Sequence, residues 1–196
     1  MIPNQLIHDL RKIVGETQVS VSRVETELYS YDASLAKGQP GVVVFPGDTN
    51  ETARVVKMTR RAGLPFVPRG FGTNLSGGTV MVSGGVVICL SRLNRIIEIL
   101  PQRRCAIAQP GVTNLELQNA LAPLGFFYAP DPASQKVATL GGNVGENSGG
   151  PRCLKYGVTT NHILGMEVIL STGEVVRIGG CAYDPPGYDL RGALVG

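Results

Sequence analysis

Two clusters of glycine constrain the fold of this chain more than any other feature of its sequence. The first lies in residues 68–78 (PRGFGTNLSGG), and in the second, five of the ten residues 141–150 are glycine. Glycine has no Cβ and adopts positive φ readily, so successive backbone N–H groups can turn to one side and form a concave anion site. Thr73, Asn74 and Ser76 add side-chain donors beside the first cluster. The other interpretation of either cluster alone is a set of tight turns that bind nothing.

The common nucleotide-binding patterns do not fit these clusters. After Gly70 and Gly72, the third glycine of a G-x-G-x-x-G pattern would fall on Leu75. A P-loop counted from Gly72 needs a lysine where Gly78 stands. The first cluster also follows the second of two predicted strands, and no long helix begins in it. These departures argue against an NAD-type Rossmann site.

Ahead of the first cluster, the hydrophobic pattern predicts a helix and then a βαβ unit. Residues 2–14 place Leu6, Leu10 and Ile13 on one face of an amphipathic helix. Residues 41–46 and 65–68 are short apolar runs typical of buried strands. The helical segment between these strands makes a crossover, so we expect the strands to be parallel.

The crossover helix, from residue 49 to about residue 62, carries capping signals at both ends. Asp48 occupies the N-cap position, with Glu51 three residues later, and Gly63 follows the last helical residue. The side chains that we expect to face inward are Val55, Met58 and Ala62.

The pattern changes after residue 78, where short strands with turns between them favour antiparallel pairing. The predicted elements are strands at 86–90, 96–100 and 105–108, a helix at 115–124 opened by Thr113 and Glu116, and a hairpin at 166–178. One βαβ unit followed by antiparallel strands predicts an α+β protein with two lobes, residues 1–78 and residues 79–196.

Composition excludes several classes of function. The 18 Lys and Arg against 15 Asp and Glu give a net charge of +3, too small over 196 residues for a nucleic-acid-binding footprint. The first residues do not have the pattern of a signal peptide, and the apolar runs 42–45 and 86–90 are too short to span a bilayer. We therefore expect a cytoplasmic protein with no transmembrane segment. The four cysteines form no C-x-x-C pair, so we expect reduced thiols and no metal site; they are Cys89, Cys105, Cys153 and Cys181.

Six segments carry a family resemblance that covers nearly the whole chain. They are residues 68–78 (PRGFGTNLSGG), 109–112 (QPGV), 130–134 (PDPAS), 138–150 (ATLGGNVGENSGG), 155–157 (KYG) and 164–168 (LGMEV). In order and spacing they closely resemble the FAD-binding domain of the vanillyl-alcohol-oxidase/PCMH flavoprotein superfamily. Within it, they look most like the FAD-binding subunit of glycolate oxidase and the related D-lactate dehydrogenases.

The resemblance implies a fold and a set of cofactor-binding residues. The fold is a two-lobed α+β FAD-binding PCMH-type domain, with a small parallel βαβ lobe, a larger antiparallel sheet with helices, and FAD between them. The implied residues are Pro68, Arg69, Gly70, Phe71, Gly72, Thr73 and Asn74 at the pyrophosphate, Asp131, Pro132, Ala133, Ser134, Thr139, Gly141 and Gly142 beside the cofactor, and Glu146, Asn147 and Gly149 along the flavin or its ribityl chain.

Four positions bear on how FAD is held. Some members of the superfamily bind FAD covalently through a histidine of the pyrophosphate loop. The matching residue here is Thr73, which implies non-covalent FAD. Arg69 has two interpretations, an anion clamp or a side chain turned to solvent beside the loop. We expect Arg152 and Lys155 to lie in a solvated charged turn.

The implied activity is FAD-dependent oxidation of a small 2-hydroxy acid, glycolate or D-lactate, by hydride transfer to the flavin. In the family, a sequence like residues 189–196 continues into the rest of the flavin site and into a substrate domain. The resemblance therefore implies a chain truncated at its C-terminus, without the substrate domain and inactive alone. No catalytic base can be named.

Three alternatives stay open. The first is another enzyme of the superfamily, similar to alkyl-glycerone-phosphate synthase or to the flavin reductase of peptidoglycan synthesis. The second is a non-catalytic FAD-binding module, or a subunit of a multi-subunit oxidase that needs partner subunits. The third is an α+β domain with glycine-rich turns and no ligand.

Overall fold

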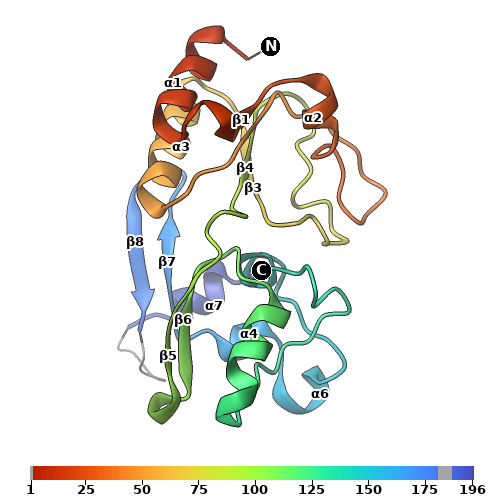
Figure 1. Ribbon diagram of the computed structural model, residues 1–196, viewed down its shortest axis with the longest axis vertical. Coiled ribbons are helices and arrows are strands. Elements are labelled where there is room, and N and C mark those ends of the chain that lie inside the picture. The colour runs from red at the N-terminus through yellow and green to blue at the C-terminus, as the bar shows by residue number, and fades with distance from the viewer. Residues whose placement is uncertain (1, 181–186) are drawn as a thin grey trace. The chain divides into compact units, whose positions relative to one another are not determined.

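The structure is a computed structural model that describes residues 2–180 and 187–196, and the chain divides into two compact units (Figure 1). The first unit is Met1–Leu93 with Ile169–Val175, and the second is Asn94–Val168 with Val176–Gly196. The sequence pattern predicts a division near residue 78. The contacts place it at Leu93, because the strand after residue 85 belongs to the sheet of the first unit.

The first unit is built on a four-stranded sheet. Its elements are α1 (Asn4–Val14), η1 (Glu16–Gln18), β1 (Val19–Ser20), α2 (Arg23–Glu27), β2 (Val42–Val44), α3 (Thr49–Arg61), β3 (Phe66–Arg69) and β4 (Val86–Cys89). The strand order is β1-β2-β4-β3, with β2 and β3 both parallel to β4 and β1 antiparallel to β2. The predicted parallel orientation of β2 and β3 is therefore confirmed.

β4 differs from the sequence-based expectation. It was predicted among the antiparallel strands, but it pairs in parallel with β2 and β3 and lies between them. All four of its residues are buried. A continuous apolar run of this kind is typical of a parallel strand covered on both faces, which is the physical reason for the correction.

The core of the first unit follows the two-residue alternation of the strands. Val42 and Val44 of β2 face one side of the sheet with Val86 and Ile88 of β4, and α1 and α3 pack on that side. Val43 faces the other side, together with Met81, Val87 and Cys89. α1 buries Leu6, Leu10 and Ile13, as the amphipathic pattern predicted.

α3 confirms its predicted caps. The Asp48 carboxylate accepts a hydrogen bond from the Glu51 N–H at 2.7 Å, and the Glu51 carboxylate accepts one from the Gly47 N–H at 2.7 Å. Gly63 follows the helix at φ +67°. Ala62 is exposed rather than inward, because it lies beyond the last helical residue as the C-cap. The buried residues of α3 are Thr52, Val55, Val56 and Thr59, and Met58 packs against the same core.

The second unit contains the remaining elements. They are β5 (Ile96–Leu100), η2 (Pro101–Arg103), β6 (Cys105–Ala108), α4 (Asn114–Leu121), η3 (Ala122–Leu124), α5 (Leu140–Glu146), α6 (Cys153–Tyr156), η4 (Thr159–His162), β7 (Gly165–Ile169), β8 (Val175–Gly179) and α7 (Leu190–Leu194); the ends of β7 and β8 nearest their connecting turn belong to the first unit. The predicted antiparallel strands pair as two-stranded ribbons, β5 with β6 and β7 with β8.

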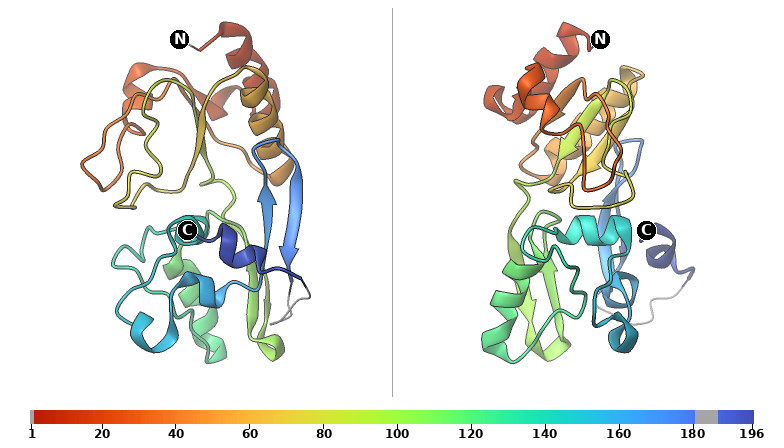
Figure 2. Two further views of the ribbon diagram at one scale, coloured as in Figure 1. Left: turned by 180° about the vertical axis from the view of Figure 1, so that it is seen from behind. Right: turned by 90° about the vertical axis from the view of Figure 1, so that its right-hand side faces the viewer.

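α4 packs on the β5–β6 ribbon and forms the core of the second unit (Figure 2). Leu117 and Leu121 of α4 and Val112, which precedes the helix, lie against side chains of both strands. The predicted opening of this helix is confirmed as a capping box. The Glu116 N–H donates to the Thr113 hydroxyl at 3.2 Å, and the Glu116 carboxylate accepts from the Thr113 N–H at 2.7 Å.

Tyr128 of the second unit gives a test of this packing in alkaline solution. Burial raises the pKa of its phenol to about 12 from 10.0, against a smaller opposing effect of a hydrogen bond with Thr159. The folded state therefore favours the neutral phenol, and this contribution to stability is lost as the pH rises from about 10 through 12. We expect the free energy of unfolding to fall more steeply over this range in the wild type than in Tyr128→Phe, measured by urea denaturation at each pH. Parallel pH profiles of the two proteins would contradict the assignment.

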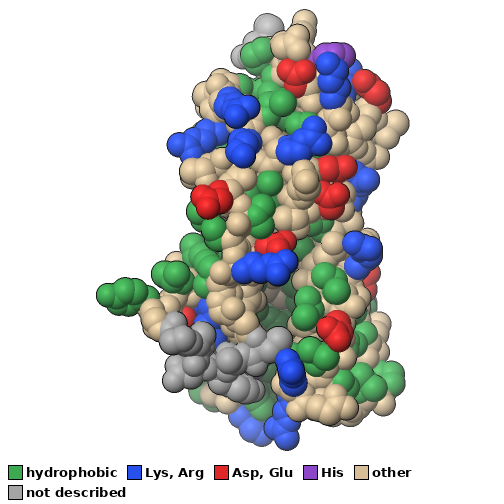
Figure 3. Space-filling view, turned by 90° about the vertical axis from the view of Figure 1, so that its left-hand side faces the viewer, with side chains coloured by type: hydrophobic (Ala, Val, Ile, Leu, Met, Phe, Trp, Pro, Cys, Tyr) green, Lys and Arg blue, Asp and Glu red, His purple; other side chains and the backbone are tan. Residues whose placement is uncertain are grey.

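The surface mixes charges of both signs. On the face seen in Figure 3, Lys and Arg side chains are interspersed with Asp, Glu and apolar side chains. Among the described residues, no helix has the length and apolar character needed to cross a bilayer. Cys89 and Cys153 are free thiols, and Cys181 lies outside the described residues.

Candidate functional site

The first glycine cluster forms an open loop directly after β3. Within the described residues, the backbone N–H groups of residues 71–75 have no hydrogen-bond partner in the protein. The Thr73 hydroxyl is likewise without a partner there. Gly72 has φ +71°, which turns the chain in the middle of this row. Consecutive unpaired N–H groups around a left-handed residue are the donor set that an anion such as a pyrophosphate requires.

Arg69 lies against this loop and does not face solvent. Its residue surface is only 5% exposed, so the interpretation of a solvent-turned side chain is wrong. The physical reason is that Arg69 ends β3 on the side of the Tyr29 ring, whose centroid lies 5.5 Å from the guanidinium carbon.

The second glycine cluster is mainly a helix rather than a turn. Residues 140–146 form α5, capped by the Thr139 hydroxyl, which accepts from the Gly142 N–H at 3.2 Å. The N–H groups of residues 140–143 all donate within the protein, so this part of the cluster offers no unpaired N–H groups to an anion. Gly141 serves close packing instead, because a Cβ there would lie 2.7 Å from the Pro110 Cβ.

The end of α5 is held in place by Asn147. It adopts a left-handed conformation, φ +47°, as the C-cap. Its side-chain oxygen accepts from the Thr160 N–H at 3.0 Å and from the Thr160 hydroxyl at 2.9 Å. This oxygen of Asn147 is therefore engaged in holding the 147–149 segment against η4. Glu146, the last residue of α5, is exposed.

A buried amide pair, which the sequence pattern does not predict, connects α4 and α5 to Pro130. The Asn143 side-chain amide donates to the Asn114 side-chain oxygen, and the Asn114 amide donates to the Pro130 carbonyl at 3.0 Å. Both asparagines are 1% exposed. No local pattern marks them, because the pairing depends on positions 29 residues apart.

Asp131, the first of the predicted residues 131–134, lies next to Gly149 and Gly150. The Asp131 N–H donates to the Gly149 carbonyl at 3.1 Å. A Cβ at Gly150 would lie 2.0 Å from the Asp131 carbonyl oxygen, so the backbone segments at Asp131 and Gly150 are in close contact. Within the described residues, the N–H groups of Ala133 and Ser134 and the Ser134 hydroxyl have no partner in the protein.

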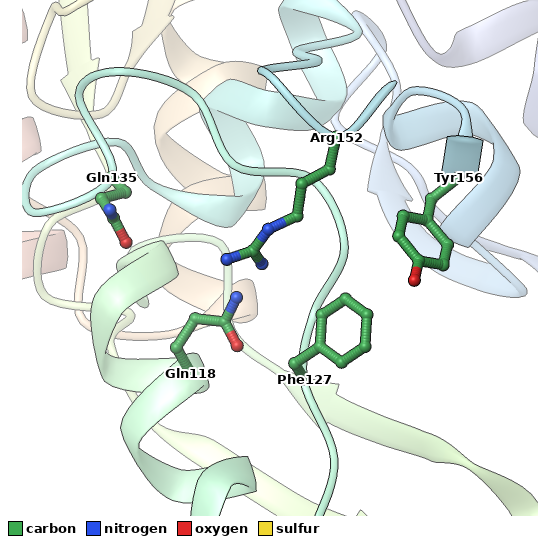
Figure 4. A pocket seen from close by; sticks show the side chains of 5 residues that line it. All are labelled: Gln118, Phe127, Gln135, Arg152 and Tyr156. Atoms are coloured by element: carbon green, nitrogen blue, oxygen red, sulfur yellow. The ribbon is translucent and has the colours of Figure 1, made fainter. Parts of the chain in front are cut away.

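An open pocket of about 540 Å³ lies beside this segment in the second unit (Figure 4). Its lining residues are Gln118, Phe127, Gln135, Arg152 and Tyr156. Arg152 points into the pocket, 5.4 Å from the Phe127 ring centroid, and pairs with the Asp131 carboxylate at 3.4 Å. Arg152 and Lys155 are both exposed, as expected for a charged turn, and Arg152 also makes these specific contacts. None of the pocket residues was predicted from the sequence to bind FAD.

The structure thus gathers the predicted cofactor residues into two groups. Residues 68–74 lie together in the first unit, where the donor set fits a phosphate group. The residues from Asp131 to Gly149 lie together in the second unit, where Thr139, Gly141 and Asn147 also have the structural roles given above.

Comparison with known proteins identifies the family. Residues 40–179 match the family described as FAD binding domain. The chain is 41% identical over 198 residues to the glycolate oxidase subunit GlcD of Bacillus subtilis (strain 168), covering 100% of this chain and 42% of that protein. It is 36% identical over 188 residues to a D-lactate dehydrogenase of Anaerostipes hadrus, covering 94% of this chain and 39% of that protein. The chain thus spans about two fifths of the length of these curated relatives.

Solved structures share the fold. An alkyldihydroxyacetonephosphate synthase superposes with a TM-score of 0.86 at 21% identity, over 100% of this chain and 40% of that one. A p-cresol methylhydroxylase with substrate bound superposes with a TM-score of 0.80 at 24% identity, over 98% of this chain and 40% of that one. The α+β fold predicted from the sequence is therefore confirmed. The match to the family model covers well over half of the chain, and we conclude that the chain belongs to the FAD-binding domain family, of the PCMH type, with FAD as its cofactor.

Proposed function

We propose that this chain is the FAD-binding part of an FAD-dependent oxidoreductase that oxidises a small 2-hydroxy acid, such as glycolate or D-lactate, to the 2-oxo acid. The observation that carries the proposal is the identity to a glycolate oxidase subunit, which extends over the whole chain at 41%. We propose further that the two units together form one FAD-binding domain.

In this proposal the residues 68–74 hold the pyrophosphate of FAD. The unpaired N–H groups of residues 71–75 receive the phosphate oxygens, and the Thr73 hydroxyl adds one donor. Backbone donors suit this task because their direction is fixed before the anion arrives, so little reorganisation accompanies binding.

The second unit holds the rest of the cofactor in this proposal. Ala133 and Ser134 contribute N–H groups and a hydroxyl without protein partners, and residues 139–149 form the wall beside the flavin and its ribityl chain. Bound FAD supplies the two-electron oxidation of the substrate α-carbon. The group that takes the substrate hydroxyl proton is not assigned to any residue of this chain.

FAD is bound without a covalent bond in this proposal, because Thr73 has a hydroxyl where some members of the superfamily have the linking histidine. The first experiment is a titration of the purified chain with FAD, followed by visible absorption and acid precipitation. We expect flavin bands that follow the folded protein and pass into the supernatant after precipitation. Flavin that stays in the pellet would overturn the non-covalent proposal, and a chain that binds no FAD would contradict the proposed function.

A second candidate function is an FAD-binding subunit or module that is inactive without partners. Two observations favour it: the relatives at 41% and 38% identity are named as subunits, and the chain spans only part of their length. The chain loaded with FAD would be assayed with glycolate, D-lactate and D-2-hydroxyglutarate, using a dye as electron acceptor. Turnover by the chain alone would exclude the inactive module. The inactive module would be supported if the chain alone shows no turnover, and if turnover appears when partner subunits, or the part of a full-length relative that this chain does not cover, are added.

A further inference from the structure

Arg69 is a buried cation without a buried anion in contact. Among the described residues, no carboxylate oxygen lies within ion-pair distance of its guanidinium. Its hydrogen bond goes instead to the Thr79 hydroxyl, at 3.3 Å from Nη1. Burial lowers the pKa of Arg69, but a guanidinium stays protonated in proteins. A full positive charge is therefore held out of water beside the loop.

A chain of hydrogen bonds runs from Arg69 to Asp32 through two neutral side chains. The Thr79 hydroxyl donates to the Asn74 side-chain oxygen at 3.0 Å, and the Asn74 amide donates to the Asp32 carboxylate at 2.7 Å. This series of hydrogen bonds begins at the Arg69 guanidinium, which only donates, and ends at the Asp32 carboxylate, which only accepts. The direction of every bond in the series is therefore fixed. Burial opposes ionisation of Asp32, but hydrogen bonds from Ser34 and Asn74 outweigh it and lower its pKa.

The same series of hydrogen bonds fixes the backbone of the loop 71–75. The Asn74 carbonyl accepts from the Ala33 N–H at 3.1 Å, so both the side chain and the backbone of Asn74 are held to the segment 32–34. At Gly72, a Cβ would lie 2.2 Å from Nη2 of Arg69. The guanidinium therefore occupies the space that a side chain at position 72 would need.

We propose that Arg69 is a positioning residue for the loop 71–75. Its buried guanidinium supports Gly72 and, through Thr79, Asn74 and Asp32, holds the row of unpaired N–H groups in the orientation that receives the FAD pyrophosphate. This inference rests on the proposed function of the loop. It differs from a direct anion clamp because Arg69 acts through Thr79 and the backbone.

The inference predicts that Thr79 matters as well as Arg69. Thr79→Val removes the hydroxyl with little change of shape, and Thr79→Ser keeps the hydroxyl as the matched control. Arg69→Met keeps a long apolar stem and removes the charge and the donors. From flavin fluorescence titration we expect Kd for FAD to rise at least tenfold in Arg69→Met and about threefold to tenfold in Thr79→Val, and to stay within twofold in Thr79→Ser.

A second measurement does not require FAD. Hydrogen exchange of the Ala33 N–H, followed by NMR in the FAD-free chain, reports whether Asn74 stays docked. We expect faster exchange in Arg69→Met and Thr79→Val, with unchanged exchange of Val43 and Val87 in the sheet. A merely structural role of Arg69 would instead accelerate all three amides together.

The outcomes separate the inference from the function on which it rests. If the wild-type chain binds no FAD, the proposed function is contradicted. The hydrogen exchange of the Ala33 N–H in the variants then decides whether Arg69 positions the loop. Arg69→Met with FAD affinity and Ala33 exchange both like the wild type overturns the inference. Thr79→Val with unchanged affinity beside a strongly weakened Arg69→Met also overturns it, because Arg69 would then act on the ligand directly.

Discussion

Replacing Gly150 by alanine is expected to destabilise the second unit by about 2–5 kcal/mol and to weaken FAD binding at least tenfold. Gly150 has φ +141°, and a Cβ there would lie 2.0 Å from the carbonyl oxygen of Asp131 and 2.4 Å from its carbonyl carbon. Both atoms belong to the backbone, so the contact is relieved only when the backbone at Asp131 or at position 150 moves. Urea denaturation and FAD titration of the variant measure the two effects.

Gly125→Ala is the matched control for this variant. Gly125 also has positive φ, +75°, but nothing lies within 4 Å of the position of a Cβ. Its cost is therefore the backbone strain alone, about 1–2 kcal/mol, with FAD binding unchanged. Equal destabilisation by the two substitutions would show that the contact between Gly150 and Asp131 does not constrain the backbone.

The second large effect is expected for Asn143→Asp, at about 3–5 kcal/mol of destabilisation at pH 7. The two side chains have nearly the same shape, but the carboxylate has no hydrogen for the Asn114 oxygen, so two acceptors face each other. The new charge would also be buried at a position that is 1% exposed. Because Asn114 holds the Pro130 carbonyl, we also expect weaker binding of FAD.

The pH dependence of this variant gives its own check. Burial raises the pKa of an aspartate in the folded state above its value of about 3.9 in the unfolded state. The penalty relative to the wild type is therefore small near pH 4 and grows as the pH rises above it. Asn50→Asp, an exposed position in the first turn of α3, is the control and should change stability by no more than about 0.5 kcal/mol. A penalty for Asn143→Asp that does not vary with pH would contradict the buried amide pair.

Local signals in the sequence predicted local structure well. Asp48 and Glu51 fixed the start of α3, and Thr113 and Glu116 that of α4, because a cap and its partner lie within one turn of each other. The motifs of the family resemblance also predicted the FAD-binding fold, which the comparisons confirm.

Contacts between residues far apart in the sequence could not be predicted from these local signals. The place of β4 in its sheet depends on pairing with strands about 20 and 44 residues earlier, as Phe66↔Val86 and Val42↔Val86 illustrate. The burial of Arg69 and the bond between Asn74 and Asp32, 42 residues apart, likewise leave no trace in a local pattern. The glycine-rich sequence could not distinguish a turn from close packing, because close packing again depends on residues distant in the sequence. At Gly141 the residue is needed for close approach to Pro110, and not for a turn.

The row of unpaired N–H groups in residues 71–75 has a consequence for how this loop tolerates genetic change. Every amino acid except proline carries the same backbone donor, so exchanging the exposed side chains of Phe71 or Leu75 leaves the row of donors complete. In the proposed function of the loop, phosphate recognition therefore depends on the path of the backbone and on the residues that set this path. We therefore expect the exposed side chains of the loop to tolerate substitution better than the buried Arg69 and the half-buried Gly72 and Thr79, which set its backbone.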